Sequence, residues 1–141
     1  KVVVADWRCD WIGLGVAEKL VLEGSTVRLC FDGETLGQNL QLYLRTHWAG
    51  VMHRLGVQTI PYARLFGTDS DTVYFHHNGS GEPIICEDVD TLILAQGHKP
   101  STALEEALGG LNIEIHLIGD CLSPRTAEEA VYEGLMAARA V

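Results

Sequence analysis

The stretch Val2-Val3-Val4-Ala5, followed after a short gap by Arg8-Cys9-Asp10-Trp11-Ile12-Gly13, decides the fold of this chain. The continuous β-branched run is typical of a parallel strand that is buried on both faces. A helical pattern at 11–23 and a second apolar strand at 26–31 complete a βαβ unit. In dinucleotide-binding βαβ units, the turn after the first strand carries the motif GxGxxG. The scaffold is therefore predicted to be of the nucleotide-binding type.

The turn itself departs from that motif. Gly13 keeps the third glycine, which lets helix and strand pack closely, whereas Arg8 and Asp10 replace the first two. A carboxylate at Asp10 occupies the place of a phosphate, which is electrostatically unfavourable, and Arg8 can pair either with Asp10 or with a phosphate. We favour a turn that has lost its ligand, with Asp10 as the helix N-cap. Arg8, Asp10 and Gly13 are the candidate cofactor-binding residues of this turn.

Two further acids follow predicted strands. Asp32 comes after the second strand, where a carboxylate usually binds ribose hydroxyls, although Phe31 holds the position at which that acid is more often expected. Asp32 is therefore either a ribose ligand or a turn residue beside Gly33. Gly119-Asp120 ends an apolar strand before a helix. Asp120 either accepts hydrogen bonds from the ribityl or ribose hydroxyls of a cofactor or caps that helix.

The remaining pattern predicts an α/β fold, with a Rossmann-like parallel sheet, helices on both faces and an inserted antiparallel β-meander. Asn78-Gly79 is a strong hairpin signal within the meander. A strand at 116–118 is expected, and its sequence leaves open whether it pairs with the parallel sheet. The predicted helices are 11–23, 39–55, 102–108 and 126–141, and the predicted strands are 2–5, 26–31, 57–60, 62–66, 72–76, 83–86, 90–95 and 116–118.

Charge and hydropathy limit the possible partners. The 141 residues carry a formal net charge of -9, which argues against nucleic acid because phosphate binding needs a basic surface. No apolar run approaches the roughly 20 residues that span a bilayer, so no membrane partner is expected. The chain lacks an initiator Met, begins within a strand and stops within a helical pattern. We therefore expect a fragment of a longer polypeptide.

The cysteines and histidines predict neither a disulfide framework nor a metal site. Cys9, Cys30, Cys86 and Cys121 form no CxxC pair, and three of them lie on or beside predicted strands. Buried, reduced thiols in a cytoplasmic protein are the favoured interpretation. Cys9, which lies in a turn, is the thiol to test for reactivity. The six histidines lack the spacing of metal ligands.

Several segments together resemble one family. They are Val2-Val3-Val4-Ala5, Ile12-Gly13 with the helix after it, Val27-Arg28-Leu29, the segment 90–100, and Leu117-Ile118-Gly119-Asp120-Cys121. The chain resembles the C-terminal region of the 2,4-dienoyl-CoA reductase and trimethylamine dehydrogenase (NADH:flavin oxidoreductase) family. Those proteins are multidomain flavoenzymes, in which an FMN-bearing TIM barrel with a 4Fe-4S cluster precedes a region of two dinucleotide folds.

The resemblance implies an organisation and a set of ligands. Residues 1–97 correspond to an NAD(P)-binding-type Rossmann domain with its meander, and residues 98–141 to the returning segment of the flanking FAD/ADP-binding-type domain. Gly97 lies in the crossover signature at 95–100, and Gly119 and Asp120 lie where an acid meets FAD or ADP. The parent would carry FMN, the 4Fe-4S cluster and FAD or ADP/NAD(P), and the fragment itself no cofactor or a nucleotide only.

Loss of the turn glycines resembles the amine dehydrogenase branch of that family. It implies a degenerate pyridine nucleotide site in a domain that catalyses nothing by itself, whose partners are the other domains of the parent. Whether the fragment counts as an enzyme stays open. The alternative function is a structural or interaction module that has lost ligand binding and docks a neighbouring domain or a redox partner.

Overall fold

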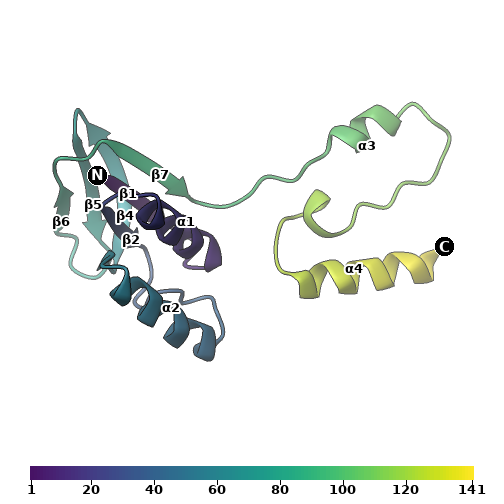
Figure 1. Cartoon of the computed structure of the whole chain (residues 1–141). Coiled ribbons are helices and arrows are strands. Elements are labelled where there is room, and N and C mark those ends of the chain that lie inside the picture. The colour runs from purple at the N-terminus through teal and green to yellow at the C-terminus, as the bar shows by residue number, and fades with distance from the viewer. The chain divides into compact units, whose positions relative to one another are not determined.

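The computed structural model describes every residue from 1 to 141, and the chain divides into two compact units, Lys1–Gly97 and His98–Val141 (Figure 1). The first unit contains two sheets and two helices, and the second contains two helices and one short 3-10 turn. Each unit is described by itself. None of the helices is long and apolar enough to cross a bilayer.

A four-stranded parallel sheet forms the centre of the first unit. Its order is β3-β2-β1-β7, and every neighbouring pair is parallel. Because all four strands run in the same direction, their carboxyl ends meet at one edge, which is where ligands bind in open α/β sheets. The strands are β1 (Val2–Asp6), β2 (Val27–Phe31), β3 (Gln58–Ile60) and β7 (Thr91–Ala95).

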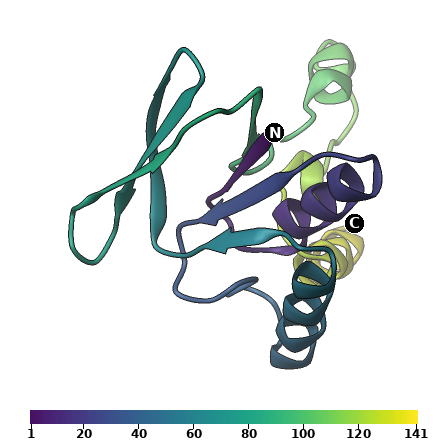
Figure 2. The ribbon, with the colours of Figure 1, turned by 60° about the vertical axis from the view of Figure 1, so that its left-hand side comes forward.

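Two helices, α1 (Trp11–Leu22) and α2 (Leu42–Arg54), pack on one face of this sheet (Figure 2). Side chains alternate along β1, so Val2 and Val4 point toward these helices while Val3 and Ala5 point away. Helix α1 ends where Gly24 adopts a φ of +95°, and the N–H of the next residue donates to a carbonyl of the last turn. The tight link into β2 follows from this cap.

Helix α2 begins three residues later than the sequence pattern predicts. The segment before it forms a turn in which the N–H of Leu40 donates to the carbonyl of Gly37 at 2.8 Å, and Gly37 has a φ of +63°. Gln41 then has a ψ of 145°, which is not helical, so the helix starts only at Leu42.

An antiparallel meander covers the other face of the parallel sheet. Its order is β4-β5-β6, and the hairpins extend away from the side that carries α1 and α2 (Figure 2). Val73 and Phe75 of the meander pack against Val3 and Ala5 of β1 in a second apolar cluster. The strands are β4 (Ala63–Asp69), β5 (Thr72–His77) and β6 (Pro83–Cys86). In the first unit, this meander thus takes the place of a second helical layer.

The second unit has almost no core of its own. It consists of α3 (Ala103–Leu108), η1 (Gly119–Cys121) and α4 (Ala127–Ala140), and Gly119 is its only buried residue. Thr126 and Glu129 form a capping box at the start of α4. The strand expected at 116–118 is wrong, and residues 114–118 do not join the parallel sheet. An apolar run becomes a strand only when a neighbour supplies ladder hydrogen bonds, and none does here.

The predicted fold class is confirmed, except that the helices of the first unit cover one face of the sheet and the meander covers the other. The structure contains a Rossmann-like parallel sheet with helices, and an antiparallel meander lies between β3 and β7 in the sequence. All predicted elements of residues 1–97 are present, most of them with ends within a few residues of the predicted ones. The first unit therefore has an α/β fold, in which a ligand site is expected at the carboxyl edge of the parallel sheet.

Candidate functional site

The start of α1 is capped by the chain's own carboxylate. Asp10 is the N-cap, and its Oδ1 accepts a hydrogen bond from the N–H of Ile12 at 3.0 Å. The Nε of Arg8 donates to the other oxygen of Asp10 at 2.6 Å. A helix N-terminus attracts anions because its first N–H groups have no helical partner. Here an internal anion already occupies that position and is neutralised by an internal cation.

A second carboxylate lies beneath the same turn. Asp6 is the last residue of β1, is only 3% exposed, and accepts a hydrogen bond from the N–H of Cys9 at 2.9 Å. Burial raises the pKa of Asp6 from its ordinary value of 3.8 to about 6, against the lowering effect of the Cys9 N–H. No cationic side chain forms an ion pair with Asp6. Asp6 is thus a buried acid held by backbone alone.

Gly13 is the turn glycine whose absence of a side chain has a clear structural reason. A Cβ at this position would lie 2.5 Å from Oδ2 of Asp6, much closer than carbon and oxygen can approach. The space next to α1 that a glycine leaves free is therefore filled by the Asp6 side chain. At Gly15, two residues further along α1, an added Cβ would meet nothing within 4 Å. Gly13 was predicted to allow close packing of helix on strand, and in this chain it is the Asp6 carboxylate that packs against it.

Cys9 belongs to this network as a buried thiol. Its backbone has a φ of +51°, its side chain is buried, and its Sγ accepts a hydrogen bond from the N–H of Gly33 at 3.2 Å. Burial raises the pKa of Cys9 to about 11. The thiolate is the nucleophilic form, so burial of Cys9 acts against its reactivity. Cys9 instead joins the β1–α1 turn to the segment after β2.

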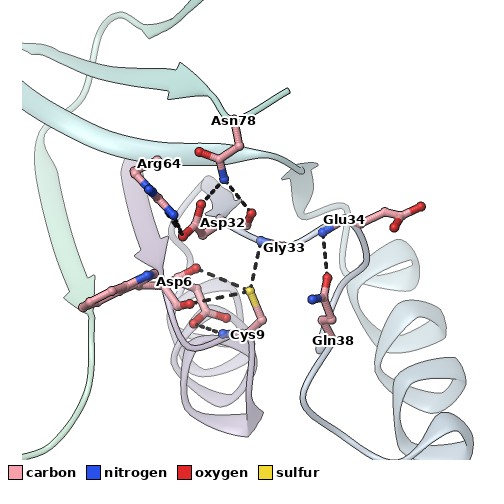
Figure 3. A network of polar contacts seen from close by, with 9 residues as sticks. Asp6, Cys9, Asp32, Gly33, Glu34, Gln38, Arg64 and Asn78 are labelled. Carbon is pink, nitrogen blue, oxygen red and sulfur yellow. Dashed lines mark hydrogen bonds and ion pairs between the residues drawn. The ribbon is translucent and has the colours of Figure 1, made fainter. Parts of the chain in front are cut away.

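Asp32 ties the parallel sheet to the meander (Figure 3). One carboxylate oxygen accepts hydrogen bonds from Arg64 of β4, with the Nη2 atom at 3.0 Å, and the other accepts one from the side-chain amide of Asn78. The same amide nitrogen donates to the Asp32 carbonyl at 2.8 Å. Both oxygens that would bind a ribose are therefore engaged within the chain. Asp32 therefore lies at the carboxyl edge, as predicted for a site residue, but its carboxylate links the sheet to the meander.

A cavity of about 290 Å³ opens beside these acids on the meander side of the sheet. Asp6 and Asp32 line it together with Arg64, Trp7 and Gln96. Gly97 lies nearby with a φ of +125°, and a Cβ there would be 3.8 Å from Cδ of Arg8. Of the predicted site residues, the structure therefore brings five together at one edge: Arg8, Asp10, Gly13, Asp32 and Gly97.

The other two predicted site residues lie in the second unit. Gly119 has a φ of +61°, and its N–H donates a hydrogen bond to the Glu133 carboxylate of α4 at 2.7 Å. A Cβ at Gly119 would lie 3.2 Å from the Cβ of Ala130. Asp120 is exposed and makes no hydrogen bond or ion pair. It does not cap α4, because Thr126 does so. The Asp120 carboxylate is free to accept hydrogen bonds from a ligand.

Three residues of the carboxyl-edge network were not predicted from the sequence. Asp6 had a local signal, since an acid directly after an apolar strand is unusual, but the predicted strand ended at Ala5. Arg64 and Asn78 are 32 and 46 positions away from Asp32, and neither gives a local signal. No group of three or more histidine, cysteine or acidic side chains could hold a metal ion.

The chain is similar in structure to segments of larger oxidoreductases. It matches 6-hydroxypseudooxynicotine amine oxidase from Pseudomonas geniculata N1 at a TM-score of 0.86 and 22% identity, over 96% of this chain and 21% of that one. It matches histamine dehydrogenase from Rhizobium sp. 4-9 at 0.81 and 19%, over 98% and 22%. For 2-naphthoyl-CoA reductase the values are 0.78 and 22%, over 94% and 20%.

No protein-family model matches the sequence, and no curated protein sequence matches it either. The chain spans about a fifth of the length of these three structures. At such identities the likeness shows the fold. The resemblance to trimethylamine dehydrogenase and dienoyl-CoA reductase proteins is confirmed at that level, and the chain has the fold of one segment of larger oxidoreductases.

The contact between Gly13 and Asp6 predicts opposite effects for two glycines of one helix. Gly13→Ala should lower the free energy of unfolding by about 1–3 kcal/mol, because the new methyl group overlaps the Asp6 carboxylate. Gly15→Ala should raise it by up to about 1 kcal/mol, because alanine favours the helix and meets open space. Urea denaturation measures both. Equal effects of the two substitutions would contradict the assignment, as would a Gly13→Ala loss that persists unchanged in an Asp6→Ala background.

Burial of Asp6 predicts a pH dependence of stability. Because folding raises the pKa of Asp6 from 3.8 to about 6, folding favours its protonated form. That contribution is complete below about pH 4 and is lost as the pH rises through about 6. Relative to Asp6→Asn, the wild-type chain should therefore lose about 2 kcal/mol of unfolding free energy between pH 4 and pH 7. Urea titrations at several pH values measure this, and parallel pH profiles for the two proteins would contradict it.

Proposed function

We propose that the chain is the nucleotide-binding-type domain of a larger FMN- and iron–sulfur-containing oxidoreductase resembling trimethylamine dehydrogenase. In this proposal its own pyridine nucleotide site is degenerate, and the domain catalyses nothing by itself. The fold and the share of the larger chains that it spans both support this function. The free thiols favour a reducing compartment such as the cytoplasm.

The observation that carries the proposal is that carboxylates of the chain itself occupy the N–H donors of the turn between β1 and α1. A dinucleotide needs bare N–H groups and a free helix N-terminus to hold its pyrophosphate. In this chain the N–H groups of Cys9 and Ile12 donate to Asp6 and Asp10. A diphosphate brought to the same donors would meet two carboxylates at close range, and like charges repel. The turn residues therefore do not fit a pyridine nucleotide.

The second unit supports the other half of the proposal. Asp120 keeps a free, exposed carboxylate beside the left-handed Gly119, which suits hydroxyl groups of a ribose or ribityl chain. Gly119 and Asp120 would accordingly contribute to the FAD- or ADP-binding domain of the parent, and residues 98–141 would be its returning segment. FMN and the 4Fe-4S cluster would be held by other domains, since the present residues offer no cluster of metal ligands.

The partners in this proposal are the remaining domains of the parent enzyme. Unit His98–Val141 exposes large apolar side chains on α4, among them Val131, Tyr132 and Leu135. A helix with such a face normally buries it against another element. A flanking domain that completes the fold around residues 98–141 would supply that cover.

A second candidate function is a structural or interaction module that docks a neighbouring domain or a redox partner. Two tryptophans favour it, because Trp7 is 59% exposed and Trp11 is 63% exposed next to the altered turn. Exposed aromatic side chains are enriched at protein interfaces. In this alternative the cleft has closed permanently and the surface around the turn serves only for docking.

Calorimetric titration with NADH and NADPH tests the proposal. The wild-type chain should bind both weakly or not at all, and low-micromolar affinity for either would contradict the degenerate site. Arg8→Gly/Asp10→Gly removes the internal ion pair, and glycine remains an acceptable N-cap, so the fold should persist. A gain of binding supports a vestigial nucleotide cleft. No gain supports the interaction module.

The matched control for that titration is Lys19→Ala/Glu23→Ala. It removes another ion pair of the α1 region, which is exposed and remote from the turn. This control should leave nucleotide affinity unchanged. If it gained affinity to the same extent as the glycine variant, the effect would reflect helix stability rather than the turn.

A further inference from the structure

Two buried thiols face each other between the two sheets of the first unit. Cys30 lies on β2 and points toward the meander, and Cys86 is the last residue of β6. Their sulfur atoms are 3.9 Å apart, and the two residues are 0% and 1% exposed. The positions are 56 residues apart in the sequence, so only the packing of the meander on the parallel sheet brings them together.

The surroundings distinguish the two sulfurs. Either sulfur can donate the thiol–thiol hydrogen bond, and this contact raises the pKa of Cys30 and lowers the pKa of Cys86. The guanidinium of Arg28 also acts to lower the pKa of both, while burial acts to raise it. Cys86 is thus the better thiolate of the pair. The rest of the cluster is apolar and includes Val73 and Phe75.

We propose that Cys30 and Cys86 are an oxidisable dithiol, which hydrogen peroxide converts into a disulfide that joins the meander to the parallel sheet. The Cys86 thiolate attacks one peroxide oxygen and breaks the O–O bond, which gives a sulfenic acid and hydroxide. The Cys30 sulfur then attacks the sulfenic sulfur, and its proton leaves with the displaced oxygen as water. Both thiols are oxidised by two electrons in total, and one peroxide is reduced to two waters.

The geometry supports bond formation between these two sulfurs and no others. A disulfide needs the sulfurs about 2 Å apart, so they must approach by roughly 2 Å. Cys86 is the last residue of its strand, so no ladder hydrogen bond restrains the backbone directly after it, where the Glu87 carbonyl accepts a hydrogen bond from the Arg28 side chain. Cys9 is engaged by the Gly33 N–H on the other face of β1, and no other thiol lies within the cluster of Cys30.

The disulfide would covalently join the parallel sheet to the meander, whose residues also hold Asp32. β4 carries Arg64 and the segment after β5 carries Asn78, and both hold Asp32 of the parallel sheet. A covalent link between β6 and β2 restrains the unfolded chain, since it closes a loop of more than fifty residues. The oxidised chain should therefore melt several degrees higher than the reduced chain.

Peroxide treatment of the whole 141-residue chain tests the proposal, both in the wild type and in a Cys9→Ala/Cys121→Ala background that retains only the pair. In the background variant, intact mass should fall by about 2 Da, for the loss of two hydrogens, and both free thiols should disappear. In the wild type, which has four free thiols, those of Cys30 and Cys86 should disappear. Digestion should yield one linked peptide that contains Cys30 and Cys86. A phosphine reductant should restore the thiols and the lower Tm.

The matched control is Cys30→Ala in the same background. Without its partner, Cys86 should gain one or two oxygen atoms and form no intramolecular link. Three results would overturn the proposal: oxygen addition to Cys86 while Cys30 is present, a link that joins Cys9 or Cys121 in the wild type, or links only between chains. Because the wild-type chain carries the main measurement, a variant that fails to fold does not decide the outcome.

Discussion

The rest of the first unit depends on the hydrogen bonds that N–H groups of the β1–α1 turn donate to two carboxylates of the same chain. Asp6 holds the N–H of Cys9 from the end of β1, and Asp10 holds the N–H of Ile12 at the start of α1. The position of α1 on the sheet follows, since Gly13 must lack a side chain for Asp6 to fit. The same two carboxylates make the turn unsuitable for a diphosphate. In our proposal, the architecture and the loss of ligand binding thus have one physical cause.

The meander extends this arrangement to the second strand. In many open α/β sheets an acid at the end of the second strand is available to a ribose. Here Arg64 and Asn78 engage both oxygens of Asp32, so the acid links two sheets that pack face to face. The Cys30–Cys86 pair lies within the same interface between sheets. The carboxyl edge of the first unit is therefore organised around contacts within the chain, which supports the proposal of a degenerate nucleotide site.

Local signals allowed much of the fold to be predicted. The run at 2–5, the glycines at helix ends such as Gly24, and Asn78-Gly79 act over a few residues, and the elements they predict are present. The strand expected at 116–118 was wrong because its apolar pattern has no partner strand, and pairing is a tertiary property. Arg8 paired with Asp10, one of two predicted options, because the two lie in one turn. The grip of Arg64 and Asn78 on Asp32 depends on distant segments and could not be predicted from the sequence.

The central claim is that the donors of the β1–α1 turn are already occupied, and inorganic pyrophosphate tests it most directly. Titration of pyrophosphate into the isotope-labelled chain, followed by the amide NMR signals of Cys9 and Ile12, reports on those donors themselves. The account predicts that both signals stay unmoved up to millimolar pyrophosphate at neutral pH. Saturable shifts of both signals would contradict it, because they would mean that an external diphosphate displaces Asp6 and Asp10.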